Sequence, residues 1–294
     1  MQKTDSKELI KFGGNLTNKT NNILSIAGAL IILLIWYLIT LDEKIIPAKI
    51  LPTPISVFKG FKDLYYDYHL FQNLWYSVSL NLTGYVYALL GALPLGFIIG
   101  IYALPKGLFQ KYTDALRYLP PPAITGIFIA IFSVGFGMKV AFLAFAIFIY
   151  LLPSVIQKIN DLQNPQNDKE YVFIQTIKTL GANNLQKFTK VYFPYVIGKV
   201  FTDIIYLTAI SWTYVVICET LNKEGGVGAM IYNLNRQSLV PLVYGVLFTI
   251  ILTGIAQDFI LKELDNTFFP YKYEKVSLIR KSISFLKKLI FTTK

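Results

Sequence analysis

The stretch that decides the fold is Asn160 to Pro194, which reads NDLQNPQNDKEYVFIQTIKTLGANNLQKFTKVYFP. It is a polar, helix-forming island between two apolar runs. The pattern predicts one helix from Lys169 to Leu180 and a second from Asn184 to Tyr192, because Gly181 suits the left-handed turn that ends a helix. Pro194 follows where a new helix can begin, since its missing N–H would be unpaired there anyway. A helix–turn–helix joined directly to an apolar run predicts a lever that moves a membrane span.

The apolar runs around this island predict an integral membrane protein. Hydrophobic residues make up 54% of the 294-residue chain and charged residues 15%, which is membrane composition. About 20 apolar residues cross the roughly 30 Å of a bilayer core. The sequence predicts an all-α fold of six transmembrane helices with a cytoplasmic helix–turn–helix. The predicted spans are Asn22–Leu41, Ser77–Leu104, Pro122–Phe136, Val140–Gln157, Tyr195–Cys218 and Val240–Leu261.

The basic residues predict the orientation of these spans. With both termini in the cytoplasm, 21 of the 28 Lys and Arg residues lie inside and seven outside, as the positive-inside rule requires. The net charge of +11 is then a topology signal, and nucleic-acid binding, its competing interpretation, is disfavoured. The predicted domains are a cytoplasmic lead (1–21), a six-helix transmembrane domain (22–265) whose polar loop covers about 160–194, and a basic cytoplasmic tail (266–294).

Two segments outside the spans carry weaker patterns. In the tail, Val276, Ile279, Ile283, Leu286 and Ile290 recur at three- and four-residue steps between Lys and Arg. This spacing predicts a basic amphipathic helix on anionic lipid, with a frayed tail of chance periodicity as the alternative. The outer connection Asp42–Trp75 predicts a surface helix over Ile55–Tyr66, which is either a structural cover or a docking site for a soluble binding protein.

Several kinds of site are disfavoured by the residue types present. Cys218 is the one cysteine and His69 the one histidine, so neither a disulfide nor a metal cluster is expected. No Gly-x-x-x-x-Gly-Lys-Ser/Thr motif occurs, so no nucleotide is expected to bind to this chain by that route. Any use of ATP would require another subunit.

The polar loop also resembles a known family. TLGANNLQKFTKVYFP, Thr179 to Pro194, is similar to the cytoplasmic coupling loop of binding-protein-dependent ABC importer permeases. Gly181, Ala182, Phe193 and Pro194 match the family pattern, whereas Gln175, Thr176 and Ile177 replace its Glu-Ala-Ala triplet. Five further segments resemble the nitrate/sulfonate/taurine branch in order: LPTPISVF (51–58), LGALPLGFIIGI (90–101), LRYLPPPA (116–123), VGFG (134–137) and ICETLNKEGGVGAMI (217–231).

The resemblance implies a function and a set of partners. The chain would be the permease subunit of an ATP-driven importer in the bacterial inner membrane, and not itself an enzyme. It would act as a homodimer with a cytoplasmic ABC ATPase, which carries ATP and Mg²⁺, and an extracytoplasmic solute-binding protein. The solute would be a small anion such as nitrate, a sulfonate or taurine. The residues expected to couple to the ATPase are Glu170, Gln175, Thr179, Gly181, Ala182, Phe193 and Pro194.

Other residues are candidates for the translocation pathway or its gate. Glu219, which ends the fifth span, precedes a segment that Gly225, Gly226 and Gly228 make free to turn; plain helix termination is the alternative. Trp212 and Tyr214 are candidates for the pathway, with packing or interfacial anchoring as the alternative. The full set expected at the pathway or gate is Glu219, Gly225, Gly226, Gly228, Trp212 and Tyr214.

Charged and small residues elsewhere have structural interpretations. Asp203 is expected to pair with Lys199, four positions back on one helical face. Arg236 could attract an anion, although exposed loop arginines usually have no such role. Gly84, Gly91, Gly96 and Gly100 in the second span predict close helix packing.

Two rival classes of function compete with the importer. An ion-gradient-driven secondary transporter would need a mid-span acid, broken helices or an inverted repeat, and the sequence shows no mid-span acid and no repeat. A membrane enzyme would need clustered catalytic carboxylates, which are likewise not found.

Overall fold

The computed structural model describes residues 14, 16–41, 46–221, 223–273 and 279, and these residues form helices and no strands. Five helical stretches are long and apolar enough to cross a membrane, and a sharply bent pair would make a sixth. This confirms the all-α membrane fold. The predicted tail helix over Val276–Phe291 lies outside the described residues, apart from position 279.

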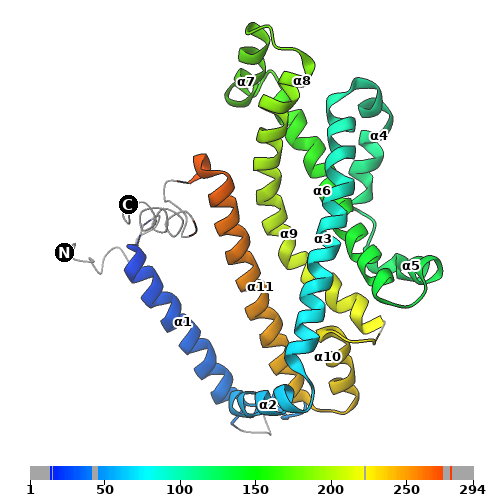
Figure 1. Ribbon diagram of the computed structural model, residues 1–294. Helices are drawn as coiled ribbons and strands as arrows, with labels where there is room; N and C mark the ends of the chain where they lie inside the picture. The colour runs from blue at the N-terminus through cyan, green and yellow to red at the C-terminus, as the bar shows by residue number, and fades with distance from the viewer. Residues whose placement is uncertain (1–13, 15, 42–45, 222, 274–278, 280–294) are drawn as a thin grey trace, which may run out of the picture. The chain divides into compact units, whose positions relative to one another are not determined.

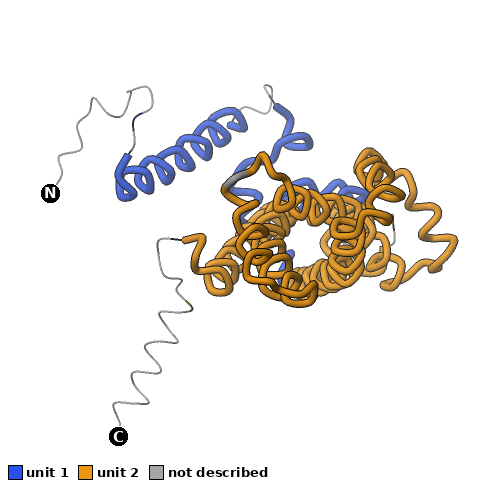
Figure 2. The backbone as a smooth tube through the Cα atoms, turned by 90° about the horizontal axis from the view of Figure 1, so that it is seen from above, with its two compact units in different colours: residues 1–68, 233–246 blue, residues 69–232, 247–294 orange. Residues whose placement is uncertain are grey.

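The chain divides into two compact units, coloured separately in Figure 2. The first unit contains residues 1–68 and 233–246. It holds α1 (Asn18–Ile39) and α2 (Pro54–Tyr66), and α2 confirms the predicted surface helix. The Thr53 side chain caps α2 by accepting the Ser56 N–H at 3.2 Å, as an N-cap residue does.

Small residues let α2 lie against the start of α11 (Val240–Phe268) within this first unit. A Cβ on Gly60 would lie 2.6 Å from Leu242 Cδ2, and one on Gly245 would lie 2.7 Å from Leu64 Cδ1. Neither position accepts a larger residue without repacking.

The second unit, residues 69–232 and 247–294, has α3 (Leu70–Ile101), α6 (Phe136–Gln163) and α9 (Phe193–Leu221) at its centre. The glycines of α3 face α6. A Cβ on Gly84 would lie 2.8 Å from Leu143, and one on Gly96 would lie 2.5 Å from Val155. The prediction of close packing along the second span is therefore confirmed.

The third predicted span, Pro122–Phe136, follows a sharp bend. The helix α4 (Ala103–Leu116) is followed by the 3₁₀ turn η1 (Pro121–Ile124) and the short helix α5 (Thr125–Phe132), and the two parts meet at 97°. The break falls at Pro120, Pro121 and Pro122, which lack the N–H groups that a continuous helix needs. The apolar stretch predicted from Pro122 to Phe136 ends at Phe132, because Ser133 has a positive φ of 57°.

The remaining elements lie at the two ends of α6 and α9 (Figure 1). At one end are α7 (Asp168–Thr179), α8 (Asn184–Lys187) and the π-helical turn η2 (Phe188–Tyr192). At the other end α9 is followed by α10 (Val227–Arg236). After α11, the 3₁₀ turn η3 (Pro270–Lys272) ends the described helices.

Candidate coupling loop and transport site

The turn between α7 and α8 has the geometry that the sequence predicts. Gly181 has a φ of +68°, the left-handed conformation that L-residues with a Cβ adopt at a cost. Its N–H donates to Lys178 O at 3.0 Å, and the Ala182 N–H donates to Ile177 O at 3.3 Å. These two bonds form a Schellman motif, which satisfies the last carbonyls of α7.

The helix after this turn differs from the prediction. Asn183 and Gln186 form a capping box, in which each side chain accepts the other residue's backbone N–H at 2.9 Å. From there the chain stays helical through η2 into α9, so Pro194 does not open a new helix. The wide turn Phe188–Tyr192 ends two residues before Pro194, where the helix must do without one backbone donor.

The residues predicted to couple lie on two sides of the loop. Gln175, Thr179 and Gly181 are exposed, and Ala182 is half-buried. Phe193 is exposed on one side while its ring stacks on Phe97, with centroids 6.0 Å apart.

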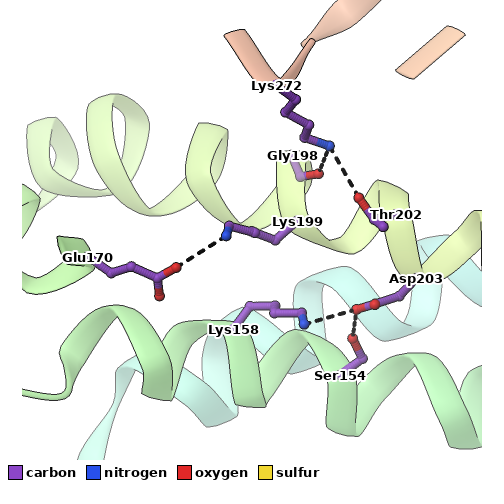
Figure 3. Close-up of polar contacts among 8 residues, drawn as sticks. All are labelled: Ser154, Lys158, Glu170, Gly198, Lys199, Thr202, Asp203 and Lys272. Carbon is purple, nitrogen blue, oxygen red and sulfur yellow. Dashed lines mark hydrogen bonds and ion pairs between the residues drawn. The ribbon is translucent and has the colours of Figure 1, made fainter. Parts of the chain in front are cut away.

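Glu170 instead faces the bundle, and it ties α7 to α9. Its Oε1 lies 3.2 Å from Lys199 Nζ (Figure 3), and its Oε2 accepts Asn167 Nδ2 at 3.0 Å. Burial alone raises the pKa of the Glu170 carboxyl, but hydrogen bonds from Tyr195 and Lys199 and the Lys199 charge outweigh it. The pKa therefore lies below its ordinary value.

The sequence did not single out the apolar residues that this loop exposes. Leu180 is 74% exposed and Leu185 is 70% exposed, and Val172 is exposed on α7. We call these three residues the apolar loop face. This face is hard to predict from the sequence, because single exposed leucines are common on protein surfaces.

The predicted pair of Asp203 with Lys199 is wrong. Asp203 Oδ2 lies 3.5 Å from Lys158 Nζ and accepts a hydrogen bond from Ser154 Oγ, both on α6 (Figure 3). Lys199 reaches Glu170. Helical spacing places Lys199 and Asp203 on one face of α9, but each pairs with a residue of a neighbouring helix. The sequence reasoning missed Ser154 and Lys158 as partners for the same reason.

A second cluster of polar contacts, centred on Lys272 of η3, joins α11 to α9. Lys272 Nζ lies 2.7 Å from Oδ1 of Asp265, a carboxylate that is 1% exposed. The same ammonium donates to Gly198 O and to Thr202 Oγ1 on α9 (Figure 3). Burial and a hydrogen bond to Asp265 raise the pKa of Tyr273 to about 12. We call this contact the Lys272 clasp.

At the opposite end of the unit, Glu219 is fully buried and its carboxylate is engaged. Ser77 Oγ donates to Oε1 at 2.7 Å, and the Gly228 N–H donates to Oε2 at 2.8 Å. Ser77 also accepts the Val227 N–H at 2.9 Å. Glu219 thus fastens the start of α10 to α3 and α9, and its role as a gate stays a prediction.

The glycines after Glu219 allow this close fit. Gly225 and Gly226 have φ values of +88° and +98°, and a Cβ on Gly226 would overlap the Glu219 carboxylate. The Gly226 N–H donates to Asn73 Oδ1 at 2.9 Å. Buried Lys139 donates to Tyr76 Oη at 3.2 Å and to Gly225 O at 3.4 Å. Sequence reasoning missed Lys139, which it placed in an outer loop.

The two aromatic pathway candidates differ in their surroundings. Trp212 is 4% exposed and donates its Nε1–H to Gln257 Oε1 at 2.8 Å, so it packs between α9 and α11. Tyr214 is half-buried, and its hydroxyl lies 3.3 Å from that of Tyr150 on α6. Trp212 also lines a cavity between α9 and α11, whereas Tyr214 faces Tyr150 on α6.

Residues 92–268 match the model of the binding-protein-dependent transport system inner membrane component family. The match spans more than half of the chain, so the chain belongs to this family. It is therefore a multi-pass inner-membrane transport subunit, the permease of an ABC importer.

Curated relatives lie in the branch that the sequence resembles. The putative aliphatic sulfonates transport permease protein SsuC of Bacillus subtilis (strain 168) is 26% identical, with 82% of this chain and 85% of the relative covered. The taurine transport system permease protein TauC of Escherichia coli (strain K12) is 22% identical, with 85% and 90% covered.

The fold is also similar to a solved structure, described as inward-facing conformations of the MetNI methionine ABC transporter. The TM-score is 0.54 at 15% identity, covering 68% of this chain and 95% of the other. At this identity the likeness concerns the fold alone.

Proposed function

We propose that this chain, as a homodimer, forms the translocation path of an ATP-driven importer. A cytoplasmic ABC ATPase carries ATP and Mg²⁺ and seats on the α7–α8 loop. An extracytoplasmic binding protein delivers the solute, and both termini lie in the cytoplasm. The names of the relatives support a small anionic solute of the sulfonate, taurine or nitrate kind.

The main support for this proposal is that one side of the α7–α8 loop is exposed and the other side is held by α9. The apolar loop face gives an ATPase a surface to bury, and burial of apolar area drives association. Glu170 and Lys199 hold the other side of the loop on α9. A displacement of the loop is therefore passed to a spanning helix through a charged contact and a continuous helix.

The proposal is tested by expressing the tagged permease with its ATPase and measuring how much ATPase copurifies. Leu185→Ser removes a 70% exposed leucine from the apolar loop face. Leu108→Ser is the matched control, since Leu108 is 53% exposed but lies on α4. Loss of one well-packed apolar contact of about 1.4 kcal/mol lowers the affinity about tenfold.

The expected result is a tenfold loss of ATPase with Leu185→Ser and none with Leu108→Ser. Equal losses, or none, would contradict the assignment of the loop. Uptake of the solute into cells distinguishes the importer from a secondary transporter. For an importer, depletion of ATP should stop uptake even while the ion gradient is intact. Uptake that instead follows the ion gradient would indicate a secondary transporter.

A further inference from the structure

Polar side chains form a track along the facing sides of α6 and α9. Tyr150, Ser154 and Lys158 are spaced four residues apart, so they share one face of α6. Opposite them on α9 lie Asp203, which contacts Ser154 and Lys158, and Tyr214, whose hydroxyl meets that of Tyr150. We call these five residues the polar track.

Lys158 and Asp203, the charged residues of this track, are partly exposed. The side chains of Lys158 and Asp203 are 26% and 27% exposed, and both lie toward the loop end of helices long enough to span a membrane. Ionisable groups at such positions face a water-filled cavity or a partner, because exposure to hydrocarbon costs several kcal/mol.

A cavity of about 280 Å³ opens at these residues. It is lined from three elements, by Arg117 at the end of α4, by Tyr150, Ser154, Gln157 and Lys158 of α6, and by Asp203, Tyr206 and Leu207 of α9. By contrast, the cavity of about 650 Å³ between α9 and α11 is lined mainly by aliphatic side chains. The smaller cavity is the one whose walls suit a charged solute.

The cavity presents both signs of charge. Lys158 and Arg117 offer cationic donors, although Arg117 already pairs with Asp114 at 2.9 Å. Asp203 offers a carboxylate on the opposite wall. A simple anion that reached Lys158 would be repelled by Asp203, because like charges at close range disfavour each other. A solute with an anionic head and an amine would satisfy both walls and replace the Lys158–Asp203 contact.

We infer that this cavity is a transport subsite for a small zwitterion, with its oxyanion head on Lys158 and Arg117 and its ammonium on Asp203. The inference rests on the proposed importer function and narrows its solute class. Ser154 and Tyr150 supply hydroxyl groups that bond either head, since a hydroxyl both donates and accepts.

Cysteine labelling tests the subsite in the purified full-length permease. Gln157→Cys places a thiol at the exposed rim of the cavity. The native Cys218 is buried, so the unmodified protein is the blank. The reagent is sulfonatoethyl methanethiosulfonate, and the protecting solutes are 2-aminoethanesulfonate and ethanesulfonate, which differ by the amine. Thr189→Cys is the control, an exposed position outside the cavity.

The expected result is that 2-aminoethanesulfonate slows labelling of Gln157→Cys at least threefold more than ethanesulfonate does, and that neither slows labelling of Thr189→Cys. Equal protection by the two solutes would show a simple anion site and overturn the inference. Absence of protection by both would overturn it as well.

Two further variants separate binding from structural support. Asp203→Asn, added to Gln157→Cys, should reduce protection by the aminosulfonate to that of ethanesulfonate. Lys158→Met should remove protection by both. If either variant changes labelling rates but leaves the difference between the solutes intact, the pair is structural and the inference fails.

The same preparations show whether the ATPase still copurifies. A permease that binds its ATPase but shows no solute protection contradicts the subsite and leaves the importer function standing. One that protects the cavity yet recruits no ATPase contradicts the importer function instead.

Discussion

Lys199 of α9 pairs with Glu170 of α7, at 3.2 Å between Nζ and Oε1, and not with Asp203 on its own helix. The contact joins the loop that is proposed to receive the ATPase to the helix that begins beside it. A short path of charge and continuous backbone therefore links this loop to the proposed transport subsite, since Asp203 lies one helical turn beyond Lys199 on α9.

The Glu170–Lys199 contact should persist at neutral pH and fail in acid. The pKa of Glu170 lies below its ordinary value, so its stabilising effect is fully present above the unfolded-state pKa. It is lost as the pH falls below the ordinary carboxyl range and through the lower folded-state pKa. Hydrogen exchange of α7 should thus show constant protection from neutral pH down to the usual carboxyl range.

Glu170→Gln should lower that protection about two- to fivefold at neutral pH, since an ion pair with a half-exposed lysine contributes about 0.5–1 kcal/mol. Its acid step should also disappear. Asp114→Asn, which breaks the exposed pair with Arg117 on α4, is the control and should leave α7 unchanged. A Glu170→Gln protein with wild-type protection would show that the contact does not hold the loop.

Gly181 should tolerate substitution only by residues that accept its backbone conformation. No atom lies within 4 Å of a Cβ built there, so any penalty comes from the positive φ. Gly181→Val should cost about 1–2 kcal/mol and reduce transport-linked ATP turnover with normal membrane levels. Gly181→Asn should be milder, because Asn visits the left-handed region. Equal activity of the two variants would mean that the turn geometry has no role in coupling.

The Lys272 clasp should contribute more to stability than an exposed ion pair does. Lys272→Met leaves the buried Asp265 carboxylate without its cation, which costs about 3 kcal/mol. Lys262→Met is the control, because Lys262 pairs with Asp258 on the surface at 2.7 Å and such pairs contribute less than about 1 kcal/mol. Thermal unfolding of the purified permease measures both, and indistinguishable midpoints would argue against the clasp.

Addition of a single methyl group to an α3 glycine that faces α6 should destabilise the packing of the two helices. Gly96→Ala places a Cβ 2.5 Å from Val155, and overpacking of this kind costs about 1–3 kcal/mol. Gly107→Ala on α4 meets nothing within 4 Å and should be neutral or stabilising by up to about 1 kcal/mol, since Ala favours helix over Gly. The prediction fails if both variants melt alike.

The asymmetry of basic residues predicts the membrane orientation. Reporter fusions at Lys59 and Lys223 should be active outside the cytoplasm and one at Lys187 inside, because short loops rich in Lys and Arg stay cytoplasmic. A Lys187 fusion that is active outside would overturn the assigned topology and remove the loop from reach of an ATPase.

The sequence predicted those features that depend on neighbouring residues. Apolar runs located the spanning helices, and Gly181 marked the turn of the loop. The partners of Asp203, Lys199 and Glu219 could not be predicted in this way, because each comes from another helix and depends on how the helices pack. The wide turn at Phe188–Tyr192 also had no clear signal beyond the proline that follows it.

This wide turn has a consequence for the rod formed by α8, η2 and α9. One π turn holds more residues than an α turn, so the helix before it and the helix after it are out of phase. A stripe of side chains that faces one direction in α8 does not continue into the same direction on α9. Leu185 is accordingly 70% exposed, whereas Val196 and Val200 on the same rod are buried. One unbroken rod can therefore present its apolar side to a partner below the membrane and to its own bundle within it.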